Sequence, residues 1–210
     1  MALTKIDIGT ELGKGWRLFQ PNMSLLIVSG LIATIVSALT CGLLSGPLSV
    51  GFFLVVRRLI QNDPIKPQPG DVFKGFDFFV QALVLFVICM AATFLLCLIP
   101  VVGHIASLAV GSVMMWGILF VAYQKLSAVE ALKKIFGYLQ SGEFTVPFFY
   151  GILVSIISGL GVLACVVGIF FTIPLSYCMM ACCHETLFSG EFEVIEPEIV
   201  PPPPPADMRL

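Results

Sequence analysis

Charged side chains are scarce in this sequence. Asp, Glu, Lys and Arg make up 11% of its 210 residues, whereas an ordinary globular domain contains about 25%. They are absent from three long stretches, Leu18–Val56, Phe78–Gln124 and Phe144–His184. Because one membrane-spanning helix needs about 20 apolar residues, each stretch is long enough for two. The composition is that of a multi-pass integral membrane protein.

An excess of basic charge is also missing. The formal net charge is -2 and the isoelectric point is about 5.6, so the chain has no basic surface to neutralise a phosphate backbone. We therefore expect no nucleic acid partner, and the lipid bilayer is the first partner expected. The residues before Ser24 lack the apolar core of a cleaved signal peptide, so we expect the first span to be retained.

Each uncharged stretch is interrupted near its middle. The interruptions are CGLLSGP (41–47), IPVVGH (99–104) and GLGVLACVVG (159–168). Because glycine and proline mark helix ends and helix starts, we predict an all-α protein of about six transmembrane helices in three helical hairpins. The second helix, at about 47–60, is short before Arg57. A complete span with a snorkelling arginine and a re-entrant half-span both stay open.

The cations predict the topology. All Lys and Arg residues lie outside the hairpins, on the side where the hairpins begin and end. They are Lys5, Lys14, Arg17, Arg57, Arg58, Lys66, Lys74, Lys125, Lys133, Lys134 and Arg209. By the positive-inside rule that side is cytoplasmic. We expect a cell membrane protein, the inner membrane in a bacterium, with both termini in the cytoplasm.

A short amphipathic segment precedes each predicted hairpin. The apolar residues at helical spacing are Leu12, Trp16 and Phe19, then Val72, Phe76 and Phe79, then Val129, Leu132, Phe136 and Leu139. Such segments are typical of helices in the headgroup plane, although chance periodicity in linkers is the alternative. Because Trp16, Phe76 and Phe136 are each 60 residues apart, we predict three parallel repeats, about 12–62, 71–127 and 128–188, within one domain of residues 1–188.

Ser127 and Glu130 form a capping box, which predicts that a helix starts there.

Small residues predict where helices pack against one another. Gly151, Ser155 and Gly159 are spaced four apart, and further pairs are Gly42 with Gly46, Ser107 with Gly111, and Ala164 with Gly168. Since association in lipid depends on close backbone approach, we expect these residues to form packing seams.

The stretch CMMACCHE, residues 178–185, is the one candidate for chemistry. Cys178, Cys182 and Glu185 share a helix face, while Cys183 and His184 point elsewhere. A structural zinc ion needs about four ligands, and a nucleophile needs a base within reach. We therefore predict no metal site, no cofactor and no catalytic residues. His184 and Glu185 are expected at the headgroup level, and His104 is expected to be an interfacial cap.

From Ser189 the chain is acidic and then proline-rich, with five consecutive prolines at 201–205. Polyproline has no internal hydrogen bonds. We therefore predict that residues 189–210 form a disordered cytoplasmic tail, either a solvated spacer or a ligand for an aromatic groove.

Four motifs resemble a bacterial family of polytopic membrane proteins. They are GPLSVG (46–51), DVFKGF (71–76), AVEALKK (128–134) and GVLACVVGIFFTIPLSY (161–177). The family comprises the membrane domain of glycerophosphodiester phosphodiesterases and its stand-alone relatives of unknown function. The resemblance implies a bare six-helix membrane module. It brings no catalytic residues, because catalysis in those phosphodiesterases resides in a separate soluble barrel domain.

Two functions are compatible with these patterns. The first is a non-enzymatic membrane module that scaffolds or assists a membrane or lipid-handling partner, or a second copy of itself. The second is a small transporter or channel for apolar or lipid-like solutes, since ionisable residues are missing from the hairpins apart from His104 and His184. The candidate polar lining is Gln81, Thr93, Ser107, Ser112, Ser155 and Thr172.

Overall fold

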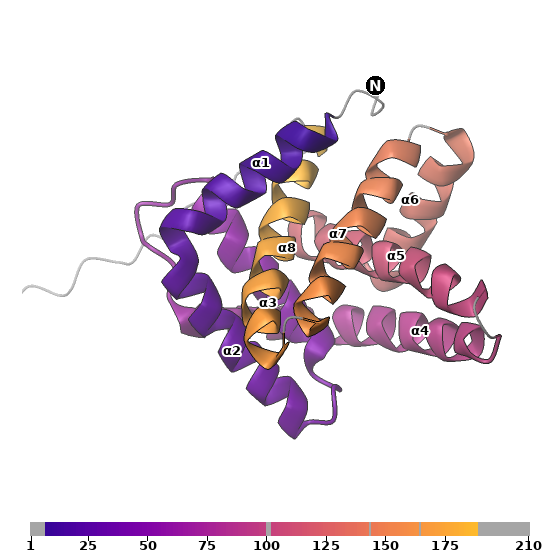
Figure 1. Cartoon of the computed structure of the whole chain (residues 1–210), viewed down its shortest axis with the longest axis horizontal. Helices are drawn as coiled ribbons and strands as arrows, with labels where there is room; N and C mark the ends of the chain where they lie inside the picture. Colours follow the sequence, from indigo (N-terminus) through magenta and orange to yellow (C-terminus); the bar gives the residue numbers. More distant parts are fainter. Residues whose placement is uncertain (1–6, 100–101, 143, 164, 189–210) are drawn as a thin grey trace, which may run out of the picture.

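The computed structural model describes residues 7–99, 102–142, 144–163 and 165–188 (Figure 1). All regular structure in these residues is helical. The α-helices are α1 (Ile8–Phe19), α2 (Met23–Leu39), α3 (Ser45–Ile60), α4 (Phe79–Cys97), α5 (Val102–Gln124), α6 (Ala128–Ser141), α7 (Thr145–Leu163) and α8 (Cys165–Phe188), with 3-10 helices η1 (Gln20–Asn22) and η2 (Pro69–Phe78). Each uncharged stretch of sequence contains two helices. The predicted tail at 189–210 and the side chains of His104 and Cys165 lie outside the described residues.

Fewer than six helices are long and apolar enough to cross a membrane by themselves. Within the described residues there are three, Ile8–Leu39, Pro69–Cys97 and Ile105–Gln124. A fourth results if α6 and Thr145–Gly161, which meet at 118°, are counted together. Helix α3 has 16 residues, about 24 Å of helix against a hydrocarbon core of about 30 Å. Length and composition therefore support a membrane protein with three to four such spans.

Helix α3 lies at the centre of the fold. Nearly all of its residues from Gly46 to Arg57 are buried. Arg57 is itself buried: its Nη1 donates to the carbonyl of Tyr123 at 3.5 Å, and its guanidinium carbon lies 5.0 Å from the centre of the Tyr123 ring. Arg57 is thus held inside the protein, and a complete span and a re-entrant half-span for α3 both stay open. A polar carbonyl and an aromatic face inside the protein surround the guanidinium.

The first amphipathic segment does not form a helix separate from the span that follows. α1, η1 and α2 make one run of 32 residues. α1 lies lengthwise along α8, with contacts from Phe19 and Phe171 (ring centres 4.9 Å apart) to Lys14 and Thr186 (3.0 Å). Between them, a Cβ on Gly15 would be 2.6 Å from the Cα of Met179. This glycine allows α1 to pack on protein, so part of its apolar stripe is buried against α8, while its position in the headgroup plane stays a prediction.

The second amphipathic segment is the 3-10 helix η2, which continues into α4. It packs on α3 with almost no side chain between the two backbones. A Cβ on Gly51 would lie 1.7 Å from the carbonyl oxygen of Val72, and one on Gly75 would lie 2.1 Å from that of Pro47. This contact is closer than any side chain permits, which explains why both positions are glycine.

The loop between α3 and η2 is held by one arginine. Arg58 Nε lies 2.8 Å from Asp63 Oδ2, and Arg58 Nη1 lies 3.0 Å from Asp71 Oδ2. The hydrogen bond from Arg58 lowers the pKa of the Asp63 carboxyl. Arg58 therefore fixes the chain reversal that places η2 on α3.

The third amphipathic segment, α6, is separated from its span by a sharp bend. Its predicted capping box is confirmed, because Ser127 and Glu130 exchange both hydrogen bonds. The buried face, however, consists of Ala128, Ala131 and Ile135. The predicted stripe lies partly outward: Val129 is 52% exposed and Phe136 54%. Small side chains bring α6 close to the rest of the protein, and the large apolar ones remain outside.

The predicted packing seams are confirmed in part. A Cβ on Gly151 of α7 would lie 2.2 Å from Ser112 Oγ of α5, and one on Gly46 of α3 would lie 2.7 Å from the carbonyl oxygen of Ala82. Gly159 and Gly42 have no such neighbour within 4 Å. The seams lie toward the buried core.

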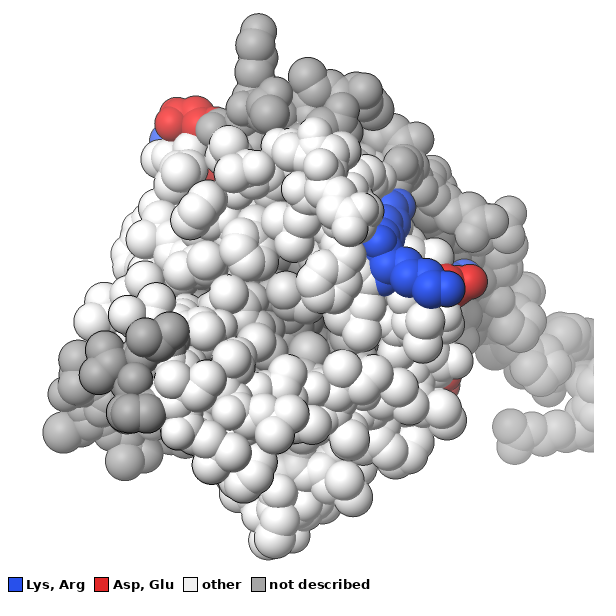
Figure 2. Space-filling view, turned by 90° about the vertical axis from the view of Figure 1, so that its right-hand side faces the viewer, with Lys and Arg blue, Asp and Glu red and all other residues white. Residues whose placement is uncertain are grey.

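Large apolar side chains cover much of the outer surface of α2 and α4. The most exposed are Ile35, Leu39, Val80, Val87, Met90, Phe94 and Leu95. Figure 2 views the molecule from the right-hand side of Figure 1, and the described surface on this face is almost entirely uncharged. Charged groups appear at its upper left and along its right-hand edge. Apolar side chains on a surface with so few charges are typical of contact with lipid.

Candidate functional site

The cysteine-rich stretch near the C-terminal end of α8 lies mostly in the interior of the protein. Cys178, Cys182, Cys183 and His184 are all buried. Within the described residues, no group of three or more His, Cys, Asp and Glu side chains could hold a metal ion. α1, α5 and α6 cover this end of α8, so His184 is enclosed by protein, while its position at the headgroup level stays a prediction.

Aromatic rings surround His184. The centre of its ring lies 5.0 Å from that of Tyr123, 5.6 Å from Phe120 and 4.9 Å from Phe188. Tyr123 also donates from its hydroxyl to the carbonyl of Phe53 at 3.1 Å, and it carries the Arg57 guanidinium on its ring. The C-terminal ends of α3, α5 and α8 thus meet in one buried polar and aromatic cluster. We call Arg57, Tyr123 and His184 the end cluster.

Two further contacts attach the amphipathic helices to this end of α8. Lys134 of α6 donates to Gln124 Oε1 at 2.7 Å, and its ammonium lies 5.6 Å from the Phe188 ring centre. Glu11 of α1 is 3% exposed and is paired with Lys14 at 2.8 Å. Thr186 accepts from Lys14 and donates to Glu11. Since these charged groups are occupied by one another, the region is suited to holding helices together.

The cysteines give a direct test of this arrangement. Cys41 and Cys97 are exposed, whereas Cys89, Cys178, Cys182 and Cys183 are buried. In a Cys165→Ser background in mild detergent, we expect a small maleimide to modify the two exposed thiols rapidly and the four buried thiols only after denaturation. Intact-mass measurement counts the adducts. Rapid modification of Cys178 and Cys183 in the folded protein would contradict the packing of α1 and α5 on α8.

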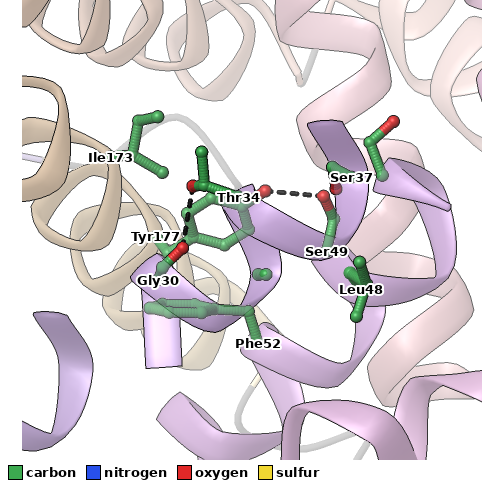
Figure 3. A pocket seen from close by; sticks show the side chains of 10 residues that line it. Gly30, Thr34, Ser37, Leu48, Ser49, Phe52, Ile173 and Tyr177 are labelled. Atoms are coloured by element: carbon green, nitrogen blue, oxygen red, sulfur yellow. Dashed lines mark hydrogen bonds between the residues drawn. The ribbon is translucent and has the colours of Figure 1, made fainter. Parts of the chain in front are cut away.

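A groove between α2, α3 and α8 is the best candidate for a binding site (Figure 3). It has a cavity volume of about 180 Å³ and opens to the outside. Among the residues that the structure describes, its lining combines hydroxyl groups with apolar surface and contains no charged side chain. The lining residues are Gly30, Ala33, Thr34, Ser37, Ser45, Leu48, Ser49, Phe52, Ile173 and Tyr177.

Hydrogen bonds fix most of the hydroxyl groups in this groove. Tyr177 donates to Ser49 Oγ at 2.7 Å, and Thr34 donates to the carbonyl of Gly30 at 2.7 Å (Figure 3). Ser45 donates to the carbonyl of Gly42. Within the described residues, Ser49 accepts this hydrogen bond and donates none. Its proton is available to an acceptor in the groove.

Packing around Tyr177 explains the shape of the groove. The Tyr177 ring centre lies 4.8 Å from that of Phe52 and 4.5 Å from that of Phe53, so α8 packs directly on α3. At Gly30, a Cβ would lie 3.1 Å from Pro174 Cγ, so α2 touches α8 there. From this contact to the turn at 40–44, the groove lies between α2 and α3.

The polar residues expected to line a passage do not line this groove. Ser112 donates to the carbonyl of Phe148, Ser155 to that of Gly151, and Thr172 to that of Ser158. The bonds of Ser112 and Thr172 join neighbouring helices, the alternative role of such groups, whereas the bond of Ser155 lies within α7. Sequence reasoning missed the groove, although a signal existed. Thr34 with Ser37, and Ser45 with Ser49, place hydroxyls three and four residues apart on the two helices of the first pair.

Comparison with known proteins adds no relative: no protein-family model, no curated protein and no solved structure matches this chain.

Proposed function

We propose that this chain is a non-enzymatic integral membrane module that scaffolds or assists a membrane or lipid-handling partner. In this proposal α2, α3, α4, α5, α7 and α8 cross the membrane as three parallel hairpins. The turns at 40–44 and 98–101 lie on one side, and both termini lie on the cytoplasmic side. The charge distribution and the uncharged surface in Figure 2 support this arrangement. The resemblance of four motifs to the membrane domain of glycerophosphodiester phosphodiesterases agrees with it.

The observation that carries the proposal is the arrangement of α1 and α6. Both helices contact the last turns of α8, through Lys14 with Thr186 and Lys134 with Phe188. Both leave large apolar side chains outside, Trp16 at 39% exposure on α1 and Phe136 on α6. Aromatic residues beside lysine and arginine are favoured at the membrane interface. This end of the protein therefore offers an apolar and basic surface to headgroups and to a partner beside them.

The sides of the membrane can be assigned by labelling. In a background without other cysteines, we expect native Cys41 to react with a membrane-impermeant maleimide from the non-cytoplasmic side only, and Gln61→Cys from the cytoplasmic side only. Ser127→Cys should match Gln61→Cys, because two spans separate them. If Cys41 and Gln61→Cys react from the same side, α3 does not cross the membrane and the six-span arrangement is overturned.

The scaffold role is tested by native mass spectrometry of the protein released from membranes in mild detergent. We expect a reproducible protein adduct, either a second copy or another membrane protein of one mass. Phe136→Asp should reduce it, because the charge removes an apolar contact from the outer face of α6. Gln140→Asp adds the same charge to an exposed site on α6 and should not. A bare monomer in all preparations would overturn the role.

The groove favours a second candidate, a site for the passage or presentation of apolar or lipid-like solutes. The described lining residues carry no charge, so an ion finds no group of opposite charge there. A solute that is mostly apolar and carries a few oxygen atoms matches the lining. Retention of lipid in the groove is the first requirement of that candidate.

A further inference from the structure

We propose that the groove between α2, α3 and α8 binds the acyl-ester region of a glycerolipid, with an ester carbonyl accepting a hydrogen bond from Ser49. The proposal requires that the helices lie in the bilayer, but it does not depend on the scaffold role. It identifies a lipid as a bound component of the fold and Ser49 as the residue that recognises it.

The chemistry of the lining selects the ester. In the hydrogen bond between Tyr177 and Ser49, Tyr177 is the donor. The hydroxyl hydrogen of Ser49 is therefore left for an acceptor in the groove. An ester carbonyl can only accept, so it complements this group. A phosphate or a carboxylate requires cationic or multiple donors, and no charged residue lines the groove. The headgroup must therefore remain outside.

The size of the groove agrees with a part of a lipid. Its volume of about 180 Å³ is slightly larger than an engineered protein cavity of about 150 Å³ that binds benzene. An ester with a few methylene groups fits, whereas a complete acyl chain does not. The remainder of the chain has apolar surface available on α2, where Leu31 and Ile35 are exposed.

The depth of the groove agrees as well. Ser45 and Ser49 occupy the first two turns of α3, directly after the turn at 40–44. If that turn lies at the membrane surface, Ser49 is about 6 Å further along the helix. This is the level at which the headgroup region gives way to hydrocarbon, where glycerol esters lie.

The test is lipid titration of the delipidated full chain, followed by native mass spectrometry. The probes are dioleoylglycerol, dioleoylphosphatidylglycerol and the dialkyl ether analogue of the latter. We expect the ether lipid, which lacks both carbonyls, to bind about 2- to 10-fold more weakly than its ester counterpart, the loss of one hydrogen bond. Ser49→Ala should weaken the ester lipids equally and leave the ether lipid unchanged. Comparison of the two ester lipids distinguishes a neutral acylglycerol from a phospholipid as the natural source.

Matched variants separate groove binding from general lipid adhesion. Ala33→Phe fills the groove and should remove the tightest lipid, ester or ether. Ala38→Phe adds the same ring to an exposed site of α2 and should have no effect. Tyr177→Phe leaves the Ser49 proton in place and should keep the preference for ester. Equal binding of ester and ether lipids by the native chain, or unchanged binding by Ala33→Phe, would overturn the proposal whether or not a scaffold partner is found.

Discussion

Gly51→Ala is expected to destabilise the fold by about 3 kcal/mol or more, at the upper end of the cost of overpacking a core. The added methyl would lie 1.7 Å from the carbonyl oxygen of Val72, so the backbones of α3 and η2 must move apart. That separation would also open the contact between Gly75 and Pro47, which lies on the same seam. Reversible unfolding in mixed micelles, followed by circular dichroism, measures the effect.

Gly137→Ala is the control for Gly51→Ala. Gly137 lies in α6, and its added methyl would meet nothing within 4 Å. Because alanine is the better helix former, we expect a gain of about 0.5–1 kcal/mol. The same substitution should thus have opposite signs at the two sites. A Gly51→Ala protein as stable as the native one would show that α3 and η2 do not approach as described.

Trp116→Ala is expected to cost about 3–5 kcal/mol, the usual range for removing a large aromatic side chain from a core. Trp116 is fully buried in α5, where its Nε1 donates to the carbonyl of Pro147 at 3.0 Å and its ring contacts Phe144 edge-on with centres 5.0 Å apart. Its loss leaves both a cavity and an unpaired carbonyl next to the α5 and α7 seam. The same unfolding measurement applies.

Trp16→Ala provides the matched control, since the chain contains two tryptophans. Trp16 is 39% exposed, so its removal should cost less than about 1 kcal/mol of stability, as for most surface substitutions. A larger stability loss for Trp16→Ala than for Trp116→Ala would contradict the burial of the two rings.

The buried end cluster has a bearing on the proposed repeats. Arg57, Tyr123 and His184 come from the C-terminal ends of α3, α5 and α8. In the predicted repeats, each of these helices is the second span of its unit. Their side chains meet at one point, with Arg57 on the Tyr123 ring and Tyr123 against His184. Three equivalent helix ends that converge are compatible with parallel units around a common axis, although the three residues differ in chemistry.

The sequence by itself determined where the helices are and that several of them are apolar enough to cross a membrane. The three uncharged stretches and their glycine and proline interruptions located the helix pairs, because composition and helix ends are local properties. The capping box of α6 was found for the same reason. The segments 12–19 and 71–79 were recognised as amphipathic. The prediction that they form helices separate from the spans that follow is wrong for α1 and η2.

Only the tertiary structure decided which face of each helix is buried and which polar groups meet. The stripe of α6 that contains Phe136 lies partly outside, because Ala128 and Ala131 allow the closer contact. His184 is enclosed because Phe120 and Tyr123 of α5, about 60 residues away in the chain, lie against its ring. Thr34, Ser49 and Tyr177 share a groove because α2, α3 and α8 meet there. In lipid, where apolar surface is satisfied on every side, helix faces are selected by close packing between distant small residues, and hydrophobicity alone does not specify those partners.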